Sequence, residues 1–433
     1  MIDRPLGAIE QLNWLIEQTA ATNVTAFAEV SGPILPRLSI ALDMLQRRHP
    51  LLRTHIVHTN FRAPRFRAGV SPIPFQVVDA ESAAVVGAVE HELNSAFPAA
   101  GPLARCVVLR HTEDTATIIL SFQHTLGDGM SSVTLMRDLL EAIAQSQDGA
   151  PSPAPLTLRP AVETFLPAAG RGLRGIVNIV RMLARQSKMD TTAVTHDGQA
   201  AHDKVHTAIG SYYLEPSLTR ALVAKARSHG TTVHGVLCAA VFLAVEKDFA
   251  RTEAVPLSCV VPVDLHARVE PTIGEELLLF NAPVTVYYRG GSARSVWEVA
   301  SDITGKLNDS ITRNEHFAGL SLMRLVSSLL ARRRAKPNGE QGMQELVAKT
   351  EVPTFLFSNL GALKINHSYG PITLHSFGFA GGLAFTMDLG CYIATLNDVL
   401  CWTFVWKEPR LSRSHIDRIV TWSLELVREA VSA

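Results

Sequence analysis

The chain has 433 residues, of which 47% are hydrophobic and 18% are charged, so it can bury a large core and an intrinsically disordered protein is excluded. Acidic and basic residues balance at 40 each, which excludes the strongly basic field typical of nucleic-acid-binding proteins. The length predicts two to three domains of ordinary size.

Helical and strand patterns alternate through the first part of the chain. Apolar residues recur at helical spacing in four stretches, and the short apolar runs between them are typical of strands. The expected helices span residues 7–20, 35–49, 83–97 and 130–145. The expected strands span residues 25–31, 51–58, 103–110 and 115–122, the last two as a pair.

The middle of the chain breaks this alternation. Prolines are dense over residues 149–160, which predicts a linker or a surface crossing. The stretch 161–188 carries five cations among apolar residues: Arg171, Arg174, Arg181, Arg185 and Lys188. It fits a basic helix that meets acidic partners or a membrane surface, although a solvated helix face is the plainer interpretation.

The second half repeats the alternation after a polar linker at about residues 190–204. The expected helices span residues 217–228, 233–250, 293–308, 317–334 and 412–431. The expected strands lie near residues 255–263, 280–288, 353–358, 371–379, 383–388 and 391–406. The pattern predicts an α/β fold of two similar lobes, residues 1–189 and 205–433.

Signals for targeting and for covalent or metal cross-links are weak. No basic stretch followed by an apolar run opens the chain, and the longest apolar stretch, 233–245, is shorter than the roughly 20 residues of a membrane span. Five cysteines lack a Cys-x-x-Cys pair, and His202 and His206 have ligand spacing but no acidic or cysteine partner nearby. We expect a cytoplasmic monomer with reduced thiols, no transmembrane segment and no metal.

The segment that carries chemistry follows the apolar run at 118–122. It reads Gln-His-Thr-Leu-Gly-Asp-Gly over residues 123–129, and a helical pattern begins directly after it. Imidazole suits general base catalysis because its pKa lies near neutrality, so His124 is a candidate base. Asp128 could orient the ring or stabilise the turn, and Gly127 and Gly129 permit unusual backbone angles. On these residues alone, a structural histidine is the more ordinary interpretation.

The wider context changes that interpretation. The segment resembles the His-His-x-x-x-Asp-Gly motif of nonribosomal-peptide condensation domains and polyketide-associated acyltransferases, within the CoA-dependent acyltransferase superfamily. Its His-x-x-x-Asp core is similar to that of plant-type acyltransferases and chloramphenicol acetyltransferase. Five further segments resemble the family in the same order: residues 5–14, 47–54, 101–105, 261–265 and 357–361. The resemblance spans residues 4–425.

The resemblance implies two chloramphenicol-acetyltransferase-like α/β sandwich lobes with a tunnel between them. It places His124, Asp128 and Gly129 in the catalytic motif, with His124 as the base and direct transfer without an acyl-enzyme. Ser358 and Asn359 would line the tunnel, where donors could stabilise an oxyanion.

Two departures from the family pattern affect the expected roles. Gln123, a substrate-binding candidate, stands where condensation domains have the first histidine, which favours the broader acyltransferase function over peptide-bond formation. Asp128 would pair structurally with a cation. Because His266 occupies the usual arginine position, the candidates are Arg268, His266 and Arg53.

The expected function is therefore acyl transfer from a thioester, on CoA or an acyl carrier protein, to a small-molecule alcohol or amine. An ester product is the first expectation, and no cofactor is expected to be permanently bound. The alternatives are a stand-alone condensation enzyme that forms an amide and a non-catalytic binding or scaffold protein. The sequence contains no Gly-x-Ser-x-Gly elbow, no phosphate-binding loop and no dinucleotide fingerprint that would favour another enzyme class.

Overall fold

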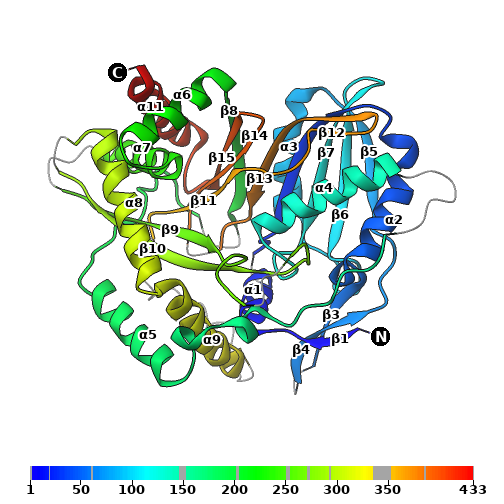
Figure 1. Ribbon diagram of the computed structural model, residues 1–433, viewed down its shortest axis with the longest axis horizontal. Helices are drawn as coiled ribbons and strands as arrows, with labels where there is room; N and C mark the ends of the chain where they lie inside the picture. Colours follow the sequence, from blue (N-terminus) through cyan, green and yellow to red (C-terminus); the bar gives the residue numbers. More distant parts are fainter. Residues whose placement is uncertain are drawn as a thin grey trace.

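The structure is a computed structural model that describes residues 2–18, 20–59, 62–145, 153–200, 204–249, 254–270, 274–291, 294–334, 353–384 and 387–432. Figure 1 shows two α/β lobes side by side, each built on a six-stranded mixed sheet. This confirms the α/β architecture of two lobes that the alternating patterns predict.

The sheet of the first lobe has the order β12-β13-β2-β7-β6-β5. Its strands are β2 (Val24–Ser31), β5 (Phe75–Asp79), β6 (Ala104–Arg110), β7 (Thr115–Phe122), β12 (Ser368–Tyr369) and β13 (Ile372–Gly381). β6 and β7 pair with each other, as predicted; the pairing is antiparallel, and β7 is almost wholly buried. The helices of this lobe are α1 (Ala8–Glu17), α2 (Leu38–Arg48), α3 (Val85–Asn94) and α4 (Gly129–Gln145). A small sheet of β1 (Asp3–Pro5), β3 (Thr54–Thr59) and β4 (Arg62–Ala68) flanks them.

The sheet of the second lobe has the order β10-β9-β11-β14-β15-β8. Its strands are β8 (His206–Leu214), β9 (Pro256–Asp264), β10 (Asn281–Arg289), β11 (Phe355–Ala362), β14 (Leu389–Leu396) and β15 (Val399–Glu408). α6 (Pro216–Ser228), α8 (Val296–Thr312) and α11 (Arg413–Ser432) pack around the central helix α7 (Val233–Asp248). α7 is apolar on all sides because it is buried there, and the Thr232 hydroxyl caps its first turn by accepting from Gly235 N–H at 3.0 Å.

One segment of the second half belongs to the sheet of the first lobe. β13 runs antiparallel to β2, with Thr373 opposite Ser31 and Gly381 opposite Val24. Residues 368–381 therefore extend the first sheet, although they fall within the range expected for the second lobe. The strand pattern at 371–379 predicts a strand correctly but contains no information about its partner.

Several sequence expectations need correction. The run at 391–406 is a hairpin of two strands, β14 and β15, because Asn397 and Asp398 adopt positive φ and reverse the chain. Residues 383, 384, 387 and 388, the described part of the strand expected at 383–388, lie outside any strand. The strand expected at 51–58 begins only at Thr54, after a 3-10 turn. The sequence patterns predict no strand at β1, β4, β5, β8 or β12.

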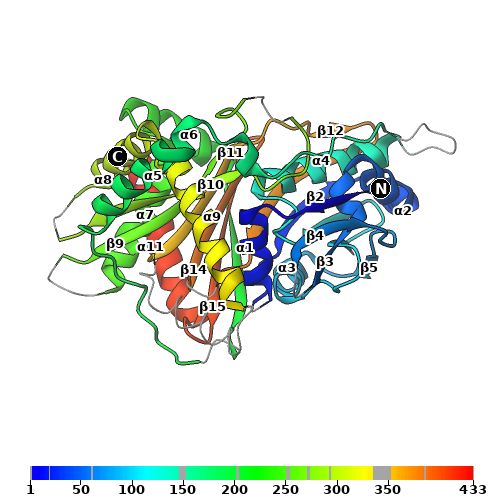
Figure 2. The same ribbon diagram turned by 90° about the horizontal axis from the view of Figure 1, so that it is seen from below.

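The basic stretch forms helix α5 (Gly172–Gln186), which packs against α9 (Glu315–Arg334). Figures 1 and 2 show α9 between the two lobes, close to α1, and Figure 1 places α5 at the outer edge of the molecule. Within the described residues, no single helix has the length and apolar composition of a membrane span, whereas α6 and α7, bent by 98°, pass that test only as a pair.

Candidate active site

His124 lies at the end of a buried strand, in a turn that fixes its ring. β7 ends at Phe122, Gln123 N–H donates to the carbonyl of Leu103 at 2.9 Å, and α4 begins at Gly129. The His124 Nδ1 lies 2.8 Å from the carbonyl oxygen of Gly127. A carbonyl only accepts, so Nδ1 carries the proton, and in neutral imidazole Nε2 is then free to accept one. This is the arrangement that a general base needs.

Asp128 holds the turn against the second lobe. Its Oδ1 accepts from Ser131 N–H at 3.1 Å and from the Ser131 hydroxyl at 3.3 Å. Its Oδ2 accepts from Phe280 N–H at 2.9 Å and from the Asn281 amide at 3.5 Å. The Ser131 hydroxyl also contacts the carbonyl of Leu278 at 3.2 Å. Asp128 is buried, and this set of donors ties the turn to residues 278–281.

The expected pairing of Asp128 with a cation is replaced by these contacts. Among the described residues, Asp128 forms no ion pair with arginine. Arg268 instead donates to the backbone carbonyl of Asp264 at 3.2 Å, and His266 pairs with the Asp264 carboxylate at 2.5 Å. Burial lowers the pKa of His266, but the carboxylates of Asp264 and Asp128 outweigh burial and raise it. Arg53 lines a separate surface cavity.

The two glycines of the motif are required for space rather than for backbone angle, since neither has a positive φ. A Cβ on Gly127 would lie 2.5 Å from the Ser131 hydroxyl oxygen, and one on Gly129 would lie 3.0 Å from Leu360 and 3.1 Å from Phe379. Gly129 therefore allows α4 to approach residues from both β11 and β13.

Two cavities meet at the motif. One, of about 220 Å³, is mainly apolar and is lined by His124 and by residues of α1, α9, β9, β11 and β13. The other, of about 370 Å³, is lined by Asp128, Asn359 and the cations Arg137 and Lys364. Both are lined by Gly129, Pro262, Asn281 and Ser358.

The structure thus brings together most of the predicted site. His124 and Ser358 line one cavity from different lobes, and Asn359 lines the other, where its side-chain oxygen accepts from Gly361 N–H at 2.7 Å. Gln123 is buried behind the turn and does not line either cavity, although its side-chain oxygen has no hydrogen-bond partner. Sequence reasoning missed Asn281, because a single asparagine at a strand start gives no signal.

Comparisons with known proteins agree with this geometry. The family model of the condensation domain matches residues 10–159, which include His124 and Asp128. The family model of the phthiocerol/phthiodiolone dimycocerosyl transferase C-terminus matches residues 203–367, which include Ser358 and Asn359. Each model covers less than half of the chain, and together they cover most of it.

Solved structures share the fold over nearly the whole chain. Polyketide synthase associated protein 5 from Mycobacterium tuberculosis is 18% identical, with a TM-score of 0.70 and coverage of 99% of this chain and 97% of that one. A trichothecene 15-O-acetyltransferase from Fusarium sporotrichioides is 12% identical, with a TM-score of 0.77 and coverage of 99% and 95%. The epimerization domain from the third module of tyrocidine synthetase B is 15% identical, with a TM-score of 0.73 and coverage of 99% and 96%. The two family models and the shared fold agree with the resemblance to the CoA-dependent acyltransferase superfamily.

One curated relative matches about a third of the chain. Over 158 residues the chain is 28% identical to phosphinothricin tripeptide synthetase PhsC from Streptomyces viridochromogenes, which covers 34% of this chain and 14% of the synthetase. The chain therefore spans a small part of the length of that protein.

Arg48 and His49, from the segment 47–54 that resembles the superfamily, belong to a polar cluster around Asp138. Asp138, on α4, accepts from Arg48 at 2.6 Å, from His49 Nε2 at 2.9 Å and from Arg137 at 2.6 Å. Arg137 also pairs with Glu275 at 2.9 Å. Burial opposes ionisation of Asp138, but these partners outweigh it and lower its pKa to about 2. The cluster fixes α4, and with it the turn that carries His124.

A carboxylate also lies near the base. Glu17, at the end of α1, accepts from both the backbone N–H and the hydroxyl of Thr22 at 2.7 Å, and Thr22 lines the apolar cavity. Burial raises the pKa of Glu17, and the two hydrogen bonds from Thr22 offset this only in part.

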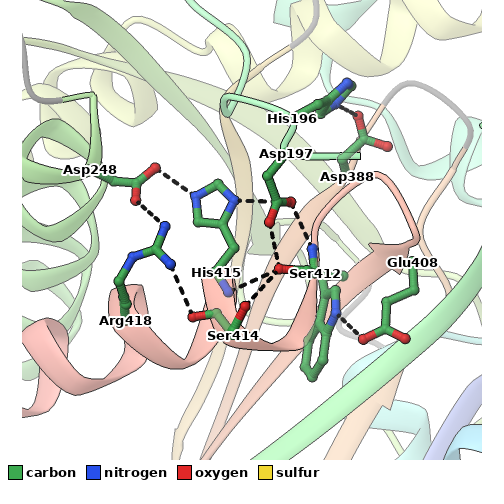
Figure 3. A network of polar contacts seen from close by, with 10 residues as sticks. His196, Asp197, Asp248, Asp388, Glu408, Ser412, Ser414, His415 and Arg418 are labelled. Carbon is green, nitrogen blue, oxygen red and sulfur yellow. Dashed lines mark hydrogen bonds and ion pairs between the residues drawn. The ribbon is translucent and has the colours of Figure 1, made fainter. Parts of the chain in front are cut away.

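A second histidine with carboxylate partners lies in the second lobe, far along the chain from the motif (Figure 3). His415 Nε2 lies 2.6 Å from Asp248, and its Nδ1 lies 3.4 Å from Asp197. The Ser412 hydroxyl pairs with Asp197 and accepts from His415 N–H at 3.2 Å, which makes it the cap of α11. Both ring nitrogens face carboxylates, so the ring is not placed to activate Ser412 as a nucleophile. The cluster is structural.

Among the described residues, no group of three or more histidine, cysteine, aspartate or glutamate side chains is arranged to hold a metal ion. His202, one of the two histidines with ligand spacing, lies outside the described residues.

Proposed function

We propose that the protein transfers an acyl group from a thioester to a hydroxyl or amine of a small molecule, with His124 as the general base. The observation that carries the proposal is the contact of His124 Nδ1 with the Gly127 carbonyl, since it leaves Nε2 as the proton acceptor of a ring that lines the apolar cavity. The matches to the two family models support acyl transfer in general.

The proposed step is a direct transfer. His124 Nε2 takes the proton of the acceptor as its oxygen or nitrogen attacks the thioester carbonyl, and a tetrahedral oxyanion forms. The intermediate then collapses, the carbon–sulfur bond breaks, and the thiolate takes the proton back from His124. Ser358, which lines the same cavity as His124 but comes from the other lobe, is our candidate donor to the oxyanion. Asp128 acts by positioning the turn.

The two cavities suggest how the substrates divide. The larger cavity suits the polar, phosphate-bearing arm of CoA or of a carrier protein, because polar side chains line it and Lys364 is a cation that attracts phosphate. The apolar cavity suits an acyl chain or an apolar acceptor. The shared residues Gly129 and Ser358 mark the place where the thioester carbonyl and the acceptor would meet. The proposal requires no resident cofactor.

An ester remains the first product proposed, because Gln123 departs from the condensation motif and one structural neighbour is an O-acetyltransferase. Amide formation between carrier-bound substrates is the second candidate, and the match to a peptide synthetase favours it.

The test measures thiol release from acyl-CoAs of increasing chain length with pooled alcohols and amines, and identifies the products by mass spectrometry. The purified protein is compared with His124→Ala and with His229→Ala, a control that removes an exposed histidine at the end of α6. We expect release to require an acceptor, to vanish in His124→Ala and to persist in His229→Ala.

Each other outcome points elsewhere. Silence with every acyl-CoA but activity with acyl-loaded carrier protein would identify the carrier as donor. Full activity of His124→Ala would overturn the proposed base. No transfer from either donor would favour a binding or scaffold protein.

A further inference from the structure

Helix α5 has an exposed apolar face that its packing does not explain. Gly175, Ile179 and Met182 are buried, and Ile179 and Met182 cluster with Ala318 of α9. A different face of α5 points to solvent and carries five apolar side chains at helical spacing: Leu173, Ile176, Val177, Val180 and Leu183. Leu173 is 82% exposed and Val180 is 59% exposed. A row of this kind marks an interaction surface, because single exposed apolar residues are ordinary but aligned ones are not.

A basic flank borders this face. Arg174, Arg181 and Arg185 share one side of α5 by their spacing of seven and four residues, and residues 171–188 contain no aspartate or glutamate. Arg185 pairs with Glu315 of α9 at 2.5 Å. Within the described part of the chain, Arg174 and Arg181 are exposed and have no ion pair or hydrogen bond. Their charge is therefore available to an external anion.

Further exposed apolar side chains lie on α9, the helix that packs against α5. The Ser321 hydroxyl donates to the carbonyl of Gly170 at 2.7 Å, just before α5 begins. Leu325 and Leu329 follow one and two turns later on α9, and each is 54% exposed. Met323, on the same helix, lines the apolar cavity that contains His124. The exposed surface and the cavity thus share one helix.

We propose that α5 docks the protein onto an anionic lipid surface, with its apolar face among the acyl chains and Arg174 and Arg181 against the head groups. An amphipathic helix of low mean hydropathy with arginines along its polar flank lies in the plane of a membrane interface. Charge complementarity favours this occupant, since each arginine near an anionic bilayer strengthens binding. The docking goes beyond the proposed function. The role of the docking, which is to bring the apolar cavity close to lipid-borne acceptors, rests on the proposed acyl transfer.

The test is co-sedimentation of the full chain with vesicles of phosphatidylcholine, alone or mixed in equal parts with phosphatidylglycerol. One variant combines Leu173→Ser with Val180→Ser, and another combines Arg174→Gln with Arg181→Gln. The control combines Val223→Ser with Arg227→Gln on α6, which removes the same two side-chain types from an exposed position elsewhere.

We expect binding to the mixed vesicles, little binding to neutral ones, and about a tenfold or larger loss in each α5 variant but not in the control. Equal thermal unfolding of all variants excludes misfolding as the cause.

Absence of binding to the mixed vesicles, or binding that the α5 variants leave unchanged, would overturn the inference. Self-association that Leu173→Ser with Val180→Ser abolishes, without vesicle binding, would show that a second copy covers the face instead. Transfer between water-soluble substrates should be unaffected by every variant, so failure of the docking and failure of the proposed function give different results.

Discussion

At the scale of single residues, the proposed chemistry depends on one hydroxyl from the second lobe. Ser358 lines both cavities, one of which His124 also lines. If it donates to the oxyanion, Ser358→Ala should lower kcat by about 10²–10³ with little change in the free energy of unfolding. Steady-state kinetics with the best acyl donor measure this, with the exposed Ser368→Ala as control. An unchanged kcat would mean that another group stabilises the oxyanion.

Asp128 shows how a motif residue can act without touching substrate. Its carboxylate accepts from Ser131, Phe280 N–H and Asn281, so an asparagine there would turn an N–H₂ group toward donors. We expect Asp128→Asn to lower the free energy of unfolding by about 2 kcal/mol and to slow transfer as well. Asn281→Ala, which removes only the 3.5 Å contact, should cost less than about 1 kcal/mol. Urea unfolding monitored by circular dichroism distinguishes the two, and equal losses would contradict this ranking.

At the scale of elements, α4 is held by the buried carboxylate of Asp138. Because the pKa of Asp138 is about 2 in the folded protein and near 3.8 when unfolded, its ionisation stabilises the fold above about pH 4, and this contribution is lost as pH falls toward 2. The difference corresponds to about 2 kcal/mol.

The matched prediction compares Asp138→Asn with Asp43→Asn, which breaks only an exposed ion pair on α2. At pH 7 we expect Asp138→Asn to cost at least about 2 kcal/mol and Asp43→Asn less than about 1 kcal/mol. Between pH 4 and 2 the difference in free energy of unfolding between the wild-type protein and Asp138→Asn should shrink, as measured by urea unfolding at each pH. A gap that stays constant with pH would show that the charge of Asp138 is not what stabilises α4.

Helices and strands that depend on a local sequence pattern are predictable from the sequence. Strands that form only by pairing with a distant part of the chain are not. The periodicity of α4 and α11, the continuous apolar run of α7 and the paired runs of β6 and β7 predict these elements closely. β8 begins in a polar stretch that does not resemble a strand. It forms a strand at the edge of the sheet because it pairs with β15, which lies far away in the sequence. For the site, the motif around His124 is local, so the sequence alone reveals it. The second-lobe donors to Asp128 lie about 150 residues away along the chain. The sequence therefore gives no means of testing whether a cation pairs with Asp128, as the resemblance implies.

At the scale of the whole molecule, the site exists only where the lobes meet. The first lobe supplies His124 and the second supplies Ser358, Asn281 and the loop that binds Asp128. β13 crosses back to pair with β2, so Phe379 joins the first lobe while the chain on either side of it belongs to the second. Neither half of the sequence therefore contains the complete cavity.

Gly129 tests this junction directly. A Cβ there would lie 3.0 Å from Leu360 of β11 and 3.1 Å from Phe379 of β13, so the neighbours must yield slightly and less space remains where both cavities are lined by Gly129. We expect Gly129→Ala to change the free energy of unfolding by less than about 1 kcal/mol but to lower kcat at least about tenfold, because the thioester carbonyl can no longer reach His124 freely. Gly305→Ala in α8, where a Cβ meets open space, is the matched control and should leave transfer unchanged.

A second substitution separates blockage from disorder of the turn. Leu360→Ala removes the Cδ2 atom that the new methyl group would meet, so in the Gly129→Ala background it should restore part of the lost kcat. If the double variant is as slow as Gly129→Ala alone, Gly129 is required by the geometry of the His124 turn rather than by the space between the lobes.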